Sequence, residues 1–142
     1  MTHQLVELIT NHWILSTLFG VVVALLLVNE GLSRKLSVMQ ISPEQVVQWM
    51  NREGAILLDI RADSAFASGH ILGSESVSST VLDKRMPSLM KYQDKPIVVV
   101  CNIGQTAASV GKQLSTQGFK KVMVLSGGIQ AWKAQGLPLV KS

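Results

Sequence analysis

The longest apolar segment of the chain lies near its N-terminus, between Glu7 and Glu30. The 22 positions 8–29 contain no Asp, Glu, Lys or Arg. As a helix that rises about 1.5 Å per residue, they would extend about 33 Å, which is enough to cross a hydrocarbon layer about 30 Å thick. We therefore expect a short N-terminal tail (1–7), one transmembrane helix (8–29) and a linker (30–41).

After residue 41 the pattern changes to short apolar runs separated by amphipathic stretches. Unbroken runs rich in β-branched residues predict strands buried on both faces, at 55–58, 97–100 and 122–125, with a shorter one at 75–77. Apolar residues at helical spacing predict helices from 43 onward and at 80–91, 106–117 and 129–135. This alternation predicts an α/β domain over 42–142, with a mainly parallel central sheet flanked by helices.

Local signals mark the ends of several of these helices. Ser42, Pro43 and Gln45 form an N-cap, first helical residue and capping-box partner for the first helix. Gly118 is placed to end the helix 106–117. Pro87 is expected to break or restart the helix 80–91.

The flanking charges predict how the membrane segment is oriented. No Lys or Arg precedes it, whereas Arg34 and Lys35 follow it, so the N-terminus should lie outside and the domain in the cytoplasm. A cleaved signal peptide is the alternative, since Gly31-Leu32-Ser33 offers a weak cleavage site, but the basic segment that begins such peptides is missing. The one cysteine, Cys101, can form no intrachain disulfide, which agrees with a reducing compartment.

Composition and charge narrow the choice of partners. Charged residues make up 15% of the chain, against about 25% in an average soluble protein, which agrees with a membrane segment. Residues after position 41 include 11 basic and 7 acidic side chains, so the domain is mildly basic. It contains no block of Lys and Arg with interleaved aromatic residues, so membrane lipid is expected as a partner and nucleic acid is not.

Cys101 is the first candidate for chemistry. It follows the strand 97–100 directly, at the end of a parallel strand where ligands bind in open α/β sheets. The loop Cys101–Thr106 contains Gly104 and leads straight into a helix, so backbone N–H groups and the helix dipole could stabilise a thiolate there. Cys101 is thus a candidate nucleophile, and the alternative is a buried small hydrophobic residue at a strand end.

Three separated segments resemble signatures of the rhodanese family, in its order and spacing, over about 100 of the 142 residues. The first comprises Asp59-Ile60-Arg61, Phe66, Gly69-His70-Ile71 and Gly73-Ser74. The second is the six-residue loop Cys101–Thr106. The third comprises Leu125-Ser126-Gly127-Gly128, Trp132, Gly136 and Pro138.

The resemblance implies a single-domain sulfurtransferase that needs no cofactor. Cys101 would take a sulfane sulfur from a small donor as a persulfide and pass it to a thiol or another nucleophilic acceptor. The persulfide would be held by the backbone amides of the loop residues Asn102, Ile103, Gly104, Gln105 and Thr106. The resemblance also places Asp59 and Arg61 near the loop, where Asp59 could orient Gln105 or form a structural ion pair with Arg61.

The sequence departs from the family at the fifth loop position, where a basic residue is common and Gln105 stands here. Thiosulfate, a dianion, is therefore not the expected physiological donor. A phosphatase is not expected, because related phosphatases need a longer loop with an arginine six positions after the cysteine, where Ala107 stands here. His70 is expected to be a hydrogen-bonded turn residue, without a second histidine at metal-ligand spacing. The alternative function is a weakly catalytic or non-catalytic module that recruits membrane-protein partners.

Overall fold

A computed structural model describes residues 12–35 and 38–142 of the chain, which forms two compact units, 1–37 and 38–142. The first unit contains helix α2 (Trp13–Lys35). Its segment Trp13–Gly31 has a mean hydropathy of 2.0 and is long and apolar enough to cross a membrane. Apolar side chains of α2 such as Leu18, Phe19 and Leu25 are exposed. The expected tail 1–7 and the first positions of the expected span, 8–11, lie outside the described residues.

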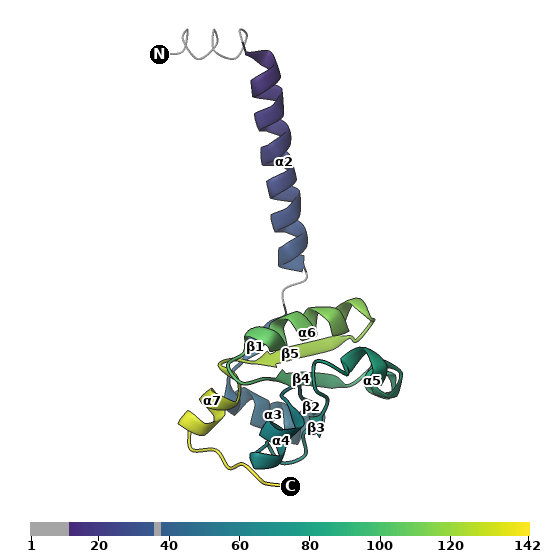
Figure 1. Cartoon of the computed structure of the whole chain (residues 1–142), viewed down its shortest axis with the longest axis vertical. Coiled ribbons are helices and arrows are strands. Elements are labelled where there is room, and N and C mark those ends of the chain that lie inside the picture. Colours follow the sequence, from purple (N-terminus) through teal and green to yellow (C-terminus); the bar gives the residue numbers. More distant parts are fainter. Residues whose placement is uncertain (1–11, 36–37) are drawn as a thin grey trace. The chain divides into compact units, whose positions relative to one another are not determined.

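The second unit is built on a five-stranded sheet in the order β1-β5-β4-β2-β3. Every pair of neighbouring strands in this sheet is parallel, which confirms the predicted α/β class (Figure 1). The strands are β1 (Met39–Ile41), β2 (Ile56–Asp59), β3 (Glu75–Ser76), β4 (Pro96–Val100) and β5 (Lys121–Leu125).

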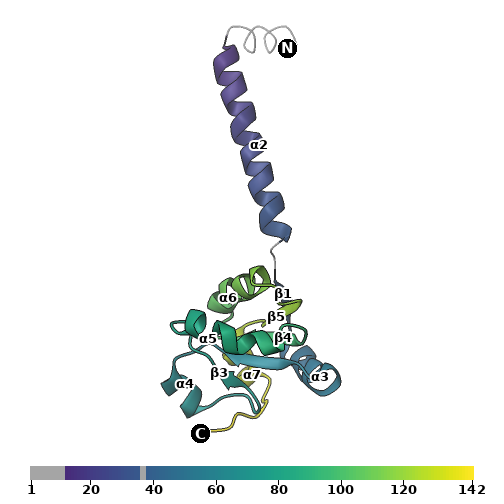
Figure 2. The ribbon, with the colours of Figure 1, turned by 90° about the vertical axis from the view of Figure 1, so that its right-hand side faces the viewer.

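Helices cover both faces of the sheet. They are α3 (Pro43–Glu53), α4 (Asp63–Ser68), α5 (Leu82–Leu89), α6 (Gln105–Thr116) and α7 (Gly128–Ala134), with a 3₁₀ turn η1 (Met90–Tyr92) after α5. Helices α5 and α6 lie on one face, and α3 and α7 on the other (Figure 2). The result is a three-layer domain whose central strand is β4.

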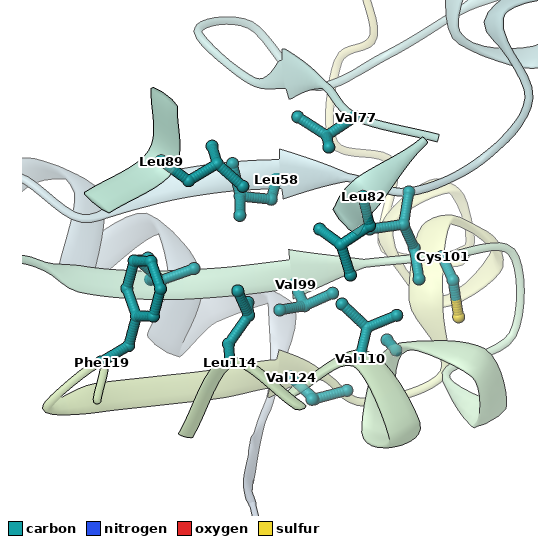
Figure 3. Packing of buried hydrophobic residues seen from close by; sticks show 13 residues of the cluster. Leu58, Val77, Leu82, Leu89, Val99, Cys101, Val110, Leu114, Phe119 and Val124 are labelled. Atoms are coloured by element: carbon teal, nitrogen blue, oxygen red, sulfur yellow. The ribbon is translucent and has the colours of Figure 1, made fainter. Parts of the chain in front are cut away.

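The residues of β4 alternate between the two hydrophobic clusters. All five are buried. Val98 and Val100 pack with side chains of α3 and α7, whereas Ile97 and Val99 pack with side chains of α5 and α6 (Figure 3). Because successive side chains of a strand point to opposite faces, the residue that follows Val100 points toward α5 and α6.

The predicted helix ends are confirmed. The Ser42 hydroxyl accepts a hydrogen bond from the Gln45 N–H at 3.3 Å, and the Gln45 side chain accepts one from the Ser42 N–H at 2.9 Å. These two bonds satisfy backbone donors that a helix N-terminus otherwise leaves unpaired. Gly118 follows α6 with φ +96°, a left-handed conformation that favours glycine.

The linker expected over 30–41 is wrong in part. Helix α2 continues to Lys35, and residues 39–41 form the edge strand β1, which pairs with β5. Of the three β1 side chains only Ile41 is buried. An edge strand this short has no apolar run of its own, so its formation depends on a partner about 80 positions away in the chain.

Two further expectations differ from the structure. Helix α5 passes through Pro87 instead of breaking there. The proline removes one backbone donor from a short helix, while burial of Leu82 and Leu89 holds its ends against the sheet. Helix α4 was not predicted, because none of its six residues is buried and its sequence therefore carries no apolar stripe.

Candidate active site

Cys101 lies at the end of the central strand with its side chain directed to the α5 and α6 face. It belongs to the same cluster as Val99 and Val110 and is 5% exposed. Figure 3 shows its sulfur at the margin of this cluster, beyond the packed aliphatic side chains. Its position thus follows from strand alternation, and the thiol is shielded from bulk solvent on the side of the core.

A backbone amide already faces the sulfur. The Gly104 N–H donates a hydrogen bond to Cys101 Sγ, with N and Sγ 2.9 Å apart. Gly104 is also the N-cap of α6 and has φ +97°. The sulfur therefore lies beside a backbone donor at the N-terminus of α6, where free N–H groups and the positive end of the helix dipole gather.

The N-terminus of α7 holds the loop from its other side. The Ile129 N–H donates to the Cys101 carbonyl oxygen at 2.9 Å, and the Gln130 N–H donates to the Asn102 carbonyl oxygen at 3.2 Å. In a trans peptide group the N–H points opposite to the C=O. Binding of both carbonyls by α7 therefore turns the N–H groups of Asn102 and Ile103 away from α7.

This contact requires glycine at position 128. A Cβ atom on Gly128 would lie 2.3 Å from the Cys101 carbonyl oxygen and 2.6 Å from the Asn102 carbonyl group. Gly128 also has φ +58°. The close approach of the two backbones thus explains the glycine at position 128, whereas a Cβ atom on Gly127 would lie 2.7 Å from the Cβ atom of Ala131 in α7 itself.

A cavity of about 370 Å³ opens beside Cys101. One part of its wall is apolar and comes from Ile60, Ala62 and Ala65. The other part carries polar side chains, from Arg61, Ser79, Asn102 and Thr106. The cavity volume lies within the range of small-molecule sites, about 300–1,000 Å³. A molecule of modest size could therefore reach the sulfur.

Asp59 and Arg61 form a buried ion pair next to this cavity. The Asp59 side chain is 1% exposed and that of Arg61 10%. The Arg61 Nε and Nη2 donate to the Asp59 carboxylate at 2.7–3.1 Å, and Nη2 also donates to the Gly69 carbonyl oxygen at 2.7 Å. The pair thereby fastens the end of α4 to the end of β2 and shapes the apolar wall.

The structure brings together most, but not all, of the predicted site residues. Asn102, Thr106 and Arg61 line the cavity with Cys101, and Gly104 contacts the sulfur through its amide. The side chains of Ile103 and Gln105 are exposed and are not among those that line the cavity. Asp59 does not line it either, and its carboxylate binds Arg61 rather than Gln105.

His70 has a structural role, as expected. It is buried, stacks on Phe66 with ring centroids 3.8 Å apart, and pairs through its backbone with Val140. Its Nδ1 lies 2.9 Å from the Phe66 carbonyl oxygen. Among the described residues, no group of three or more His, Cys, Asp or Glu side chains is placed to hold a metal ion.

Sequence reasoning missed several residues of the site. Ser79, Ala62 and Ala65 line the cavity, and small side chains in loops and exposed helices give no local signal of such a role. The donors on Ile129 and Gln130 were missed as well. Their signal was present, because a glycine pair between a strand and a helix indicates close approach of another backbone.

Replacing Gly128 with alanine should release the loop. The added Cβ displaces the Cys101 and Asn102 carbonyl groups, so the amides of Gly104, Ile129 and Gln130 should exchange with deuterium about tenfold faster or more in the full-length protein. The matched control is Gly54→Ala, because Gly54 has φ +61° and nothing within 4 Å of its Cβ position. It carries the same backbone strain, about 1–2 kcal/mol, and should leave exchange at the loop unchanged. Equal acceleration in both variants would contradict the close-approach explanation.

Comparison with known proteins agrees with this geometry. Residues 42–135 match the sequence profile of the rhodanese-like domain. The chain is 30% identical over 139 residues to the uncharacterised protein YibN of Escherichia coli K12, covering 97% of each. It is 36% identical over 96 residues to the thiosulfate sulfurtransferase GlpE of Pseudomonas putida F1, covering 67% of this chain and 84% of that protein.

Solved structures show the same fold. The rhodanese-related protein of Thermoplasma volcanium superposes with a TM-score of 0.66 at 26% identity, over 73% of this chain and 99% of that one. The polysulfide-sulfur transferase of Wolinella succinogenes, a homodimer, superposes with a TM-score of 0.60 at 26% identity, over 81% of this chain and 88% of that one. By its sequence profile, its relatives and its fold, the chain belongs to the rhodanese-like family.

Proposed function

We propose that the protein is a membrane-anchored sulfurtransferase that carries a sulfane sulfur on Cys101. The observation that carries this proposal is the hydrogen bond from the Gly104 N–H to Cys101 Sγ at the edge of a cavity. A buried thiol that serves only as a core residue needs neither an amide donor nor an open cavity. Both features suit a nucleophile that must hold negative charge before and after it reacts.

The reaction proceeds in two displacements at sulfur. In the first, the Cys101 thiolate attacks the outer sulfur of a donor R–S–SH. The bond between the two donor sulfurs breaks, a bond from Sγ to the outer sulfur forms, and the electron pair leaves on the thiolate R–S⁻. In the second, an acceptor thiolate attacks the outer sulfur of the Cys101 persulfide, and the Cys101 thiolate leaves. No net oxidation or reduction occurs in either step.

The loop backbone is proposed to stabilise the charge that moves between these sulfurs. Gly104 donates to Sγ, and the peptide N–H groups of Asn102 and Ile103 are turned away from α7. The first amides of α6, on Gln105 and Thr106, are free of intrahelical partners by their position. Donors that are fixed before the reaction stabilise developing charge at little reorganisation cost.

A second candidate function rests on the charge of the loop. Cys101–Thr106 contains no Lys or Arg, and Gln105 is exposed. A loop without a cation attracts an anionic donor weakly, so the domain could instead recruit partners at the membrane with little or no catalysis. Turnover measurements separate the two functions.

The N-terminal unit is proposed to act as a single-pass anchor. Trp13–Gly31 is apolar enough to span a membrane, and at about 1.5 Å per residue its 19 residues extend about 28 Å, close to the hydrocarbon thickness of about 30 Å. Arg34 and Lys35 follow it, which favours a cytoplasmic domain and an N-terminus outside. We propose 8–29 as the membrane segment, residues from Val38 onward as the catalytic unit, and lipid and a membrane protein as partners.

Sulfur transfer by the full-length protein in detergent should depend on Cys101. With a small persulfide as donor and a thiol as acceptor, double-reciprocal plots should be parallel, because the enzyme alternates between free and persulfidated forms. Cys101→Ser keeps the size of the side chain but removes its sulfur, and turnover should fall to the uncatalysed rate. Persistent turnover in Cys101→Ser would overturn the assignment of Cys101. No turnover in the wild type would favour the recruiting module.

Cysteine labelling in intact cells tests the orientation. Because Cys101 is 5% exposed, it is replaced by serine, and single cysteines are introduced as Gln4→Cys or Lys141→Cys. A membrane-impermeant thiol reagent should label position 4 in intact cells and position 141 only after lysis. The reverse pattern would overturn the orientation, and release of a soluble domain would indicate a cleaved signal peptide.

A further inference from the structure

The wall of the cavity beside Cys101 includes a positively charged residue, whereas the loop Cys101–Thr106 has none. Among the described residues that line the cavity, Arg61 is the one that carries a positive charge. It comes from the segment after β2, about 40 positions before Cys101 in the chain. A search for a basic residue limited to the loop Cys101–Thr106 could not have found it.

The ion pair leaves one end of the Arg61 guanidinium available. Nε and Nη2 are bound by the Asp59 carboxylate and the Gly69 carbonyl oxygen. Nη1 carries two further N–H donors, and no described residue forms a hydrogen bond with them. Every buried side-chain nitrogen or oxygen among the described residues has a partner, so Nη1 is accessible and not a buried unpaired group. Arg61 is one of the residues that line the cavity, and Nη1 is the part of its guanidinium that no described residue binds.

The fixed geometry of Arg61 gives this donor a definite direction. The guanidinium is planar, and Asp59 holds it through three contacts of 2.7–3.1 Å. The Arg61 side chain is 10% exposed, so its remaining donors are only partly screened by water. Hydrogen bonds to charged groups are stronger than neutral ones, and the ligand group that best matches Nη1 is therefore an anionic oxygen.

The apolar part of the cavity wall indicates which chemical group of a ligand would lie between its anionic oxygen and its reacting sulfur. Ile60, Ala62 and Ala65 offer apolar contacts, and the volume of about 370 Å³ exceeds what a small inorganic anion fills. A ligand that occupies the cavity needs an aliphatic part between a sulfur at Cys101 and an acidic group at Arg61. The Asp59 carboxylate already balances the charge of Arg61, so the cavity is suited to one carboxylate rather than to a compact dianion.

We infer that Arg61 is a specificity-determining residue whose Nη1 binds the carboxylate of a short organic persulfide donor. This inference rests on the proposed function, since it names the donor class for the same cysteine. The donor would place its outer sulfur at Cys101 Sγ, its aliphatic chain along Ile60 and Ala65, and its carboxylate at Arg61. The transfer step is the first displacement given above, with a carboxyalkyl thiolate as the leaving group.

Two matched donors test the inference on the full-length protein: the persulfide of 3-mercaptopropionate and that of 3-mercaptopropanol, which has a hydroxyl in place of the carboxylate. Wild-type kcat/KM should be about tenfold higher for the carboxylate donor, as expected for one charge-assisted hydrogen bond that is partly screened. In Arg61→Lys, the ammonium group keeps a charge for Asp59 but lacks the second donor arm. The preference should then fall below about twofold.

Arg85→Lys is the matched control. Arg85 pairs with Glu75 at 2.9 Å, is about half exposed and does not line the cavity. It should retain the full preference for the carboxylate donor. Thermal unfolding of each variant shows whether it is folded. If Arg61→Lys is unfolded, the inference is judged by the ratio of wild-type kcat/KM values for the two donors.

The outcomes separate this inference from the proposed function. Equal kcat/KM for the two donors in the wild type would overturn the role of Arg61 while leaving Cys101 chemistry intact. An unchanged preference in a folded Arg61→Lys variant would also overturn it. Turnover with neither donor, and with no other sulfane donor, would instead count against the proposed function.

Discussion

The site depends on two hydrogen bonds from the N-terminus of α7 to the carbonyl oxygens of Cys101 and Asn102. A buried backbone carbonyl needs a partner, and the first amides of α7 supply these partners. Because each peptide group is planar, this choice also fixes where the following N–H groups point. The amide donors of the loop are therefore set by a helix that itself contributes no side chain to the cavity.

This constraint explains why distant parts of the chain must fold together. Gly128 allows the backbone of α7 to reach the loop, since a Cβ atom there would lie 2.3 Å from the Cys101 carbonyl oxygen. Gly104 turns the chain into α6 and directs its N–H to the sulfur. The loop is thus held between two helix N-termini, one binding its carbonyl groups and the other facing its thiol.

The buried ion pair of Asp59 and Arg61 likewise holds two chain segments together next to the cavity. Asp59 and Arg61 join the end of β2 to the carbonyl group that ends α4. A buried pair of this kind costs desolvation and is a poor source of net stability. Its role here is to fix positions, because its hydrogen bonds hold the end of α4 against β2 and keep the Arg61 guanidinium in one orientation.

Much of this could be predicted from the sequence, for physical reasons that differ among elements. Strand β4 is buried on both faces, so its unbroken apolar run was enough to predict it. Cys101 was then predicted as a site residue because it directly follows this strand. The capping box at Ser42 is local and was equally visible. Strand β1 and helix α4 were not predicted, because one depends on a distant partner and the other buries no side chain. The family resemblance grouped Asp59 and Arg61 with the loop.

The details of the cavity required three-dimensional placement. Nothing in the neighbourhood of Ser79 indicates that it faces Cys101, since the two are brought together only by the sheet order β4-β2-β3. Likewise, the family resemblance places Arg61 near the loop, but only the structure shows that Arg61 lines the same cavity as Cys101. Both placements depend on contacts between segments that are far apart in the chain.

The most direct test is to observe the sulfur on Cys101. The full-length protein is incubated with a small persulfide, freed of excess donor and examined by mass spectrometry. We expect a gain of one sulfur atom on the peptide that contains Cys101, its removal by a thiol acceptor, and no gain in Cys101→Ser. A wild-type protein that stays unmodified with organic persulfides, thiosulfate and mercaptopyruvate would contradict it.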